Sequence, residues 1–109
     1  MDRRPVSQAT QRRYEEIAAG LERVGVKASS MFGMPTLKRN GKAIGGLWGD
    51  AMTFKLSPDG LADALRIEGA HQFDPSGLGR PMKSWVVVPL AQSAEWERLA
   101  QLALAASDA

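Results

Sequence analysis

The fold of this chain is decided by residues 31–58, which run MFGMPTLKRNGKAIGGLWGDAMTFKLSP. Two turn signals, Asn40-Gly41 and Gly49-Asp50, separate short segments that carry apolar side chains. Asn-Gly favours a two-residue type I′ turn, because both central residues of that turn need a positive φ. Residues 31–58 therefore predict consecutive hairpins, and strands linked in this way pair antiparallel.

Four extended segments are expected around these turns, at residues 26–32, 35–39, 42–48 and 51–56. In the last segment apolar and polar residues alternate, which is the pattern of a half-buried strand. Gly45-Gly46 interrupts the third segment. Glycine weakens a strand there unless it marks a bulge, a bend or a close approach of two backbones.

Three helices are expected. Residues 7–24 have amphipathic spacing, with Ser7 as the N-cap and Gly25 as a left-handed residue that ends the helix. Ser57-Pro58-Asp59 announces a second helix, which we expect to end at Gly69. The last helix is expected at residues 93–107.

The remaining segments complete an α-β-β-β-β-α-β-β-α order. Residues 70–80 predict a short strand end followed by a loop, and residues 85–88 predict a buried strand that Pro89 closes. The prediction is a two-layer α+β fold, with an antiparallel sheet of about five to six strands and helices packed on it. Residues 1–109 are expected to form one domain, with residues 1–6 as a flexible N-terminus.

Composition narrows the class of protein. A hydrophobic fraction of 44% is typical of a globular chain. The chain has no cysteine, which excludes a disulfide framework, a thiolate zinc site and a cysteine nucleophile. The lack of cysteine also suits a reducing compartment, so we expect a cytoplasmic protein. No apolar stretch predicts a signal peptide or a membrane span.

Charge is distributed unevenly along the chain. Residues 1–42 hold nine Lys and Arg against four acids, whereas residues 43–109 hold five against eight. Such asymmetry can mark a face that binds nucleic acid, although we favour the simpler interpretation that most of these charges are solvated surface charges. The candidate nucleic-acid contacts are Arg12, Arg13, Lys38, Arg39 and Lys42.

Few residues suggest catalysis. His71 is the single histidine of the sequence, and we interpret it as an exposed loop residue rather than part of a triad. Metal sites usually recruit several His or Cys ligands. Gly77-Leu78-Gly79-Arg80 lacks a helix behind it to bind a phosphate. We therefore expect no catalytic, cofactor-binding or metal-binding residues. Trp48 and Trp85 are expected in the core, with base stacking as the alternative.

The last helix suggests a homodimer. Its predicted inner face carries Trp96, Leu99, Ala100 and Ala103. Leu102 and Leu104 lie off that face. A helix that is apolar on more than one side often packs against another chain. The candidate dimer interface is therefore Leu99, Leu102 and Leu104, with one leucine simply exposed as the alternative.

From residue 24 to residue 107 the chain resembles the N-terminal domain of the TfoX family of bacterial competence regulators. The family motif is Met31-Phe32-Gly33 at the opening of the sheet. Further matching features are the Asn40-Gly41 turn, Phe54-Lys55-Leu56, Phe73, Pro81-Met82, Trp85, Pro89 and the final helix rich in alanine and leucine.

Gly33, between two extended segments, is expected to have a positive φ, so that Gly33→Val would destabilise the fold.

The resemblance implies a fold similar to secretion chaperones, with no known catalytic activity and no cofactor. Full-length TfoX proteins add a C-terminal domain, and this chain is interpreted as a stand-alone copy of the first domain. The resulting hypothesis is a non-enzymatic regulatory or protein-interaction module that forms a homodimer or binds an unknown protein partner. The first alternative is a weak nucleic-acid binder that uses a basic face. The second is a small-ligand binder, or an enzyme with its pocket between sheet and helices.

Overall fold

The predicted hairpins form an antiparallel sheet of six strands in the computed structural model, which describes residues 6–31, 34–74, 79 and 82–108. Across the sheet the order is β1-β2-β3-β4-β6-β5. The two edge strands are therefore β1 and β5. The strands are β1 (Val26–Met31), β2 (Met34–Arg39), β3 (Lys42–Leu47), β4 (Ala51–Lys55), β5 (His71–Gln72) and β6 (Trp85–Pro89).

The turn between β2 and β3 confirms the Asn-Gly prediction. Asn40 has a φ of 53° and Gly41 a φ of 78°, as a type I′ turn requires. Gly45-Gly46 combines a bulge with a close backbone approach. Leu37 pairs with Gly45 and Lys38 with Ala43, so the register between β2 and β3 shifts there.

Three α-helices lie in the described residues: α1 (Gln8–Leu21), α2 (Pro58–Ala64) and α3 (Trp96–Ser107). The Ser7 hydroxyl accepts the Thr10 N–H at the start of α1, and the Ser57 hydroxyl accepts the Gly60 N–H at the start of α2. Both predicted N-caps are confirmed. Gly25 has a φ of 88°, which confirms the predicted left-handed residue.

The predicted helix bounds need correction. The predicted first helix, residues 7–24, ends as a 3₁₀ turn, η1 (Glu22–Val24). Another 3₁₀ segment, η2 (Leu90–Glu95), precedes α3, which begins at Trp96 rather than at residue 93. α2 ends at Ala64, five residues before Gly69, because its last carbonyls accept i→i+3 hydrogen bonds from Arg66 and Ile67.

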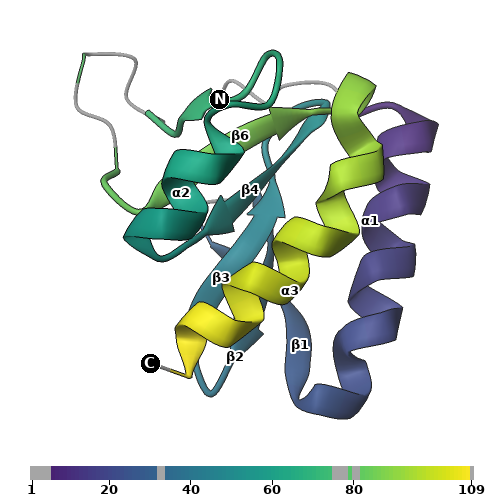
Figure 1. Cartoon of the computed structure of the whole chain (residues 1–109). Coiled ribbons are helices and arrows are strands. Elements are labelled where there is room, and N and C mark those ends of the chain that lie inside the picture. The colour runs from purple at the N-terminus through teal and green to yellow at the C-terminus, as the bar shows by residue number, and fades with distance from the viewer. Residues whose placement is uncertain (1–5, 32–33, 75–78, 80–81, 109) are drawn as a thin grey trace.

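Helices cover one face of the sheet (Figure 1). α1, α2 and α3 all contribute to a core that they share with inward-facing strand residues such as Met52 and Phe54. Trp96 is fully buried at its centre, and its indole N–H donates to the Val88 carbonyl at 3.1 Å. This is the two-layer α+β fold that the sequence predicts.

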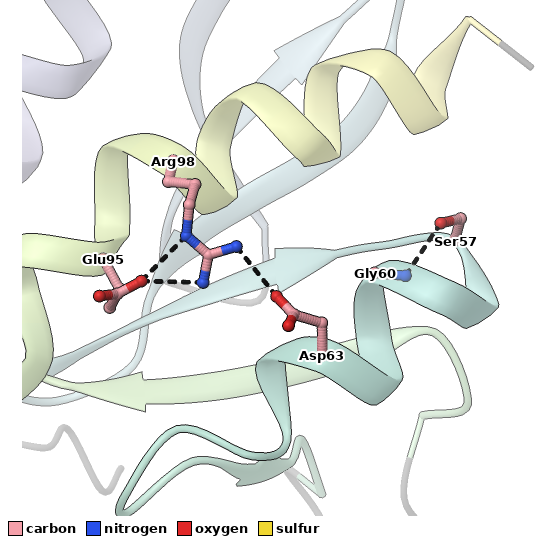
Figure 2. A network of polar contacts seen from close by, with 5 residues as sticks. All are labelled: Ser57, Gly60, Asp63, Glu95 and Arg98. Carbon is pink, nitrogen blue, oxygen red and sulfur yellow. Dashed lines mark hydrogen bonds and ion pairs between the residues drawn. The ribbon is translucent and has the colours of Figure 1, made fainter.

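An exposed ion-pair network links the last two helices (Figure 2). The Arg98 guanidinium contacts the Asp63 carboxylate of α2 at 2.9 Å and the Glu95 carboxylate of η2 at 2.8 Å. These two carboxylates raise the pKa of Arg98 by hydrogen bonding. Because all three side chains are solvent-accessible, the network contributes little stability and serves to orient α2 against α3.

Candidate binding surface on the open sheet face

The second face of the sheet, here called the open face, carries its own apolar cluster. Side chains alternate along a strand, so residues next to the core positions of β4 and β6 point to this face. No helical residue of the described chain belongs to the cluster. Its buried members are Ala51, Phe73, Trp85 and Val87, and Met34, Ala43 and Trp48 pack against them partly buried.

Three aromatic rings form the centre of this cluster. The Trp48 and Phe73 rings meet edge to face with centroids 5.1 Å apart, and the Phe73 and Trp85 centroids are 6.3 Å apart. Such geometries are favourable for aromatic pairs. Trp85 is buried, as expected for a strand tryptophan, whereas Trp48 is half-buried and remains accessible to a partner.

Small residues cross the open face beside the rings. Thr36 pairs with Gly46, and Gly46 pairs with Thr53, so the three lie side by side on β2, β3 and β4. A Cβ on Gly46 would lie 2.5 Å from the Pro35 carbonyl oxygen, which shows how closely the backbones approach there. The small residues leave the middle of the open face without long side chains.

A pocket of about 370 Å³ lies at one end of the open face. Its lining includes Trp48, Asp50, His71 and Phe73. One Asp50 oxygen accepts the Ser7 N–H at 2.7 Å, and this bond, with a further one from Thr10, lowers the pKa of Asp50. That carboxylate therefore anchors the start of α1. Among the described residues no three His, Asp or Glu side chains gather as metal ligands.

His71 differs in place from its prediction. It is exposed, as expected, but it lies on the edge strand β5 rather than in a loop. Its Nδ1 lies 3.0 Å from the Gln72 carbonyl oxygen. The side chain therefore contacts its own strand at the rim of the pocket.

Lysines gather at the opposite end of the open face. Lys27 on β1 lies directly opposite Lys38 on β2. Lys55 on β4 lies directly opposite Trp85, so it also projects to the open face. A second pocket, of about 350 Å³, is lined by Lys27, Lys38 and the Asn40-Gly41 turn, among others.

The predicted nucleic-acid contacts are not brought together. Arg12 and Arg13 lie on α1 in the helix layer, where Arg13 pairs with Glu16 at 3.3 Å. Arg39 points to the helix side of the sheet and pairs with Asp108 at 2.5 Å, and Lys42 lies opposite Arg39. Lys38 alone among the five faces the lysine end of the open face. The structure therefore does not gather these five residues on one surface, and their contact with nucleic acid stays a prediction.

Sequence reasoning missed Lys27 and Lys55. The alternation of Met52, Phe54 and Leu56 already indicated that Lys55 leaves the core side of its strand. The position of Lys27 depends on how β1 pairs with β2. Finding Lys27 beside Lys38 requires the register of the β1–β2 hairpin. A search of the sequence for runs of basic residues does not use that register.

The predicted dimer surface on α3 is also changed by the structure. Leu99 is fully buried, and Leu104 packs partly buried against the core. Leu102 is exposed. α3 packs against β3, β4 and α1, so more than one side of the helix is covered within the chain. Leu99 is therefore excluded as an interface residue. Of the three leucines predicted to form the dimer interface, Leu102 is the one that is exposed.

The family motif falls partly outside the described residues. Met31 is the last residue of β1, while Phe32 and Gly33 lie in the gap between the described ranges. The expected positive φ of Gly33 stays a prediction.

Comparison with known proteins found no relative of this chain. No protein-family model matches the chain, and neither a curated protein nor a solved structure matches it. Within the described ranges, no helix has the length and apolar character that crossing a membrane requires.

Proposed function

We propose that this protein is a non-enzymatic interaction or regulatory module, similar to the TfoX N-terminal domain, and that it binds a protein partner through the open face. The observation that supports this most directly is the aromatic cluster on the sheet face opposite the helices. Aromatic residues and methionine are enriched in the centres of protein interfaces.

The accessible part of the cluster suits a binding surface. Trp48 and Met34 are half-buried and pack against the buried cluster, and the Trp48 ring contacts the Phe73 ring directly. A side chain that is held in place by a packed base loses little freedom when a partner covers it. The small residues Thr36, Gly46 and Thr53 lie on the same sheet face and are themselves buried. Together these features resemble a half-buried anchor residue on a packed base, an arrangement typical of interface hot spots.

A second copy of the chain is the partner that we propose first, with another protein as the alternative. With Leu99 and Leu104 packed inside the chain, the open face replaces α3 as the surface of this dimer. Two-fold dimers are the commonest soluble assemblies. A cytoplasmic location is also proposed, because a chain without cysteine suits a reducing compartment.

Affinity capture tests the alternative partner, another protein bound through the open face, whereas sedimentation equilibrium tests a second copy of the chain. The wild-type chain and its Met34→Glu variant serve as baits in a nuclease-treated bacterial lysate, and captured proteins are identified by mass spectrometry. Leu102→Glu is the matched control, because it places the same charge on an exposed residue of the helix layer. We expect one set of proteins on the wild-type and Leu102→Glu baits that is lost with Met34→Glu. The same set on all three baits contradicts the proposal.

A further inference from the structure

Three lysines on the open face form a row without acidic partners. The lysine row consists of Lys27, Lys38 and Lys55, on β1, β2 and β4. Lys27 and Lys55 are exposed and Lys38 is half-buried. Among the described residues no carboxylate lies within ion-pair distance of any of the three. Arg39, which points to the other face, does have such a partner in Asp108.

This placement is unfavourable for the isolated fold. Like charges directly opposite each other on neighbouring strands repel, and Lys27 and Lys38 occupy such a pair. A lysine on an edge strand can prevent unwanted strand pairing, which accounts for Lys27 on β1. The same reason does not apply to Lys38 and Lys55, because β2 and β4 are interior strands. An anionic partner that contacts this face relieves the repulsion between Lys27 and Lys38 and pairs with Lys55.

The spacing of the row suits a linear polyanion. From β1 to β4 there are three strand separations of about 4.8 Å, so the row spans about 14 Å. The small side chain of Ala43 on β3, which pairs with Lys38, lies between the second and third lysines. Beside the first two lysines the pocket of about 350 Å³ also includes Ser29 in its lining. Two of the three cations, Lys27 and Lys38, line this pocket, and Lys55 continues the row across β3 on the same sheet face.

We propose that the lysine row binds a single-stranded nucleic acid through its phosphates. Trp85 lies directly opposite Lys55, and the cluster continues from it to the half-buried Trp48. Trp85 and Phe73 are buried, so they support this surface from below and the phosphates are the main contacts. A single strand is flexible enough to follow a short row of lysines on a sheet, and its unpaired bases can contact the rim of the cluster, whereas a duplex hides its base faces. This activity goes beyond the protein-interaction role and uses a different end of the open face.

Fluorescence anisotropy with a labelled single-stranded oligonucleotide of about 20 nucleotides tests the proposal. Each phosphate neutralised on a single strand contributes about −0.7 to the slope of log affinity against log salt concentration. Three lysines predict a slope of about −2, which is an affinity loss of about 20-fold between 50 and 200 mM salt. The double variant Lys27→Glu/Lys38→Glu is expected to bind more than tenfold more weakly at 50 mM salt. Lys38→Arg, which keeps the charge, is expected to bind like the wild type.

The matched control is Arg12→Glu/Arg66→Glu, which makes the same change in net charge on exposed residues outside the sheet. It should keep most of the affinity, and circular dichroism verifies that both double variants are folded. Three results overturn the proposal. These are no anisotropy change at 50 mM salt with tens of micromolar protein, an equal loss of affinity in the control, or equally tight binding of a duplex of the same sequence. None of these results bears on protein capture by the Met34 surface, so the two proposals fail separately.

Discussion

Single residues correctly predict three local features of this chain: the turn at Asn40-Gly41, the N-cap at Ser7 and the helix end at Gly25. Each acts through its own backbone or through a neighbour within three positions, so the sequence is sufficient to place the turn, the cap and the helix end. The contacts of Lys38 and Arg39 were not predictable in this way. Lys38 and Arg39 are adjacent in the sequence but point to opposite faces of the sheet. Lys38 lies opposite Lys27 because of the register of β1, and Arg39 pairs with Asp108 at the end of α3.

Tyr14 carries a buried hydroxyl that has no hydrogen-bond partner in the described chain. Burial raises the pKa of Tyr14 to about 12. An unsatisfied buried hydroxyl costs about 1–3 kcal/mol, so Tyr14→Phe is expected to stabilise the fold by about 1 kcal/mol in urea unfolding. The raised pKa also makes the native state hold this proton more tightly. The wild type should therefore lose stability above pH 10, a loss that Tyr14→Phe lacks. A destabilised Tyr14→Phe variant would show that the hydroxyl has a partner.

Gly46 is predicted to be intolerant of a side chain. Its Cβ would lie 2.5 Å from the Pro35 carbonyl oxygen and 3.3 Å from the Thr36 Cα, both of them backbone atoms. Gly46→Ala should force β2 and β3 apart and destabilise the fold by about 1–3 kcal/mol. The control is Gly20→Ala, because a Cβ at this position of α1 meets nothing within 4 Å. It should be neutral or stabilise by up to about 1 kcal/mol. Equal free energies of unfolding for the two variants contradict this explanation.

At the scale of elements, the strands were predicted well and the helices less so. The strands follow from local alternation and turn signals, and the structure has strands in all four segments predicted between residues 26 and 56. The helix ends depend on i→i+3 hydrogen bonds that sequence patterns do not reveal, as at Ala64. The burial of Leu104 depends on how α3 packs between the sheet and α1. An amphipathic pattern gives no information on how many neighbours a helix has.

The attachment of α1 to the β3–β4 turn should depend on pH. Hydrogen bonds from Ser7 and Thr10 lower the pKa of Asp50 from 3.8, so the carboxylate is favoured in the folded state. The stabilisation is present above the unfolded pKa of about 4 and is lost as pH falls through the lower, folded pKa. Asp50→Asn should remove this part of the acid sensitivity. The measurement compares urea unfolding of both proteins from pH 7 to pH 2, and parallel pH profiles would contradict the assignment.

At the scale of the whole molecule, the helices cover one sheet face, and the other face carries the aromatic cluster and the lysine row. The fold class was predictable because alternation and turn chemistry are local properties. The open face was not, because it exists through the register of strands far apart in the chain. Thr36 on β2 and Thr53 on β4 flank Gly46, and β5 brings Phe73 to Trp85. The aromatic cluster and the lysine row both result from these pairings.

Sedimentation equilibrium of the wild-type chain, with Met34→Glu and Leu102→Glu in parallel, tests the open face as an interface most directly. A monomer has a mass of 11.8 kDa. The proposed dimer predicts a mass that rises above this value as the wild-type concentration approaches about 100 μM, a range in which weak interfaces associate. Leu102→Glu should behave like the wild type, and Met34→Glu should stay monomeric. A constant mass of 11.8 kDa for the wild type, or a dimer that Met34→Glu leaves intact and Leu102→Glu disrupts, would contradict the account.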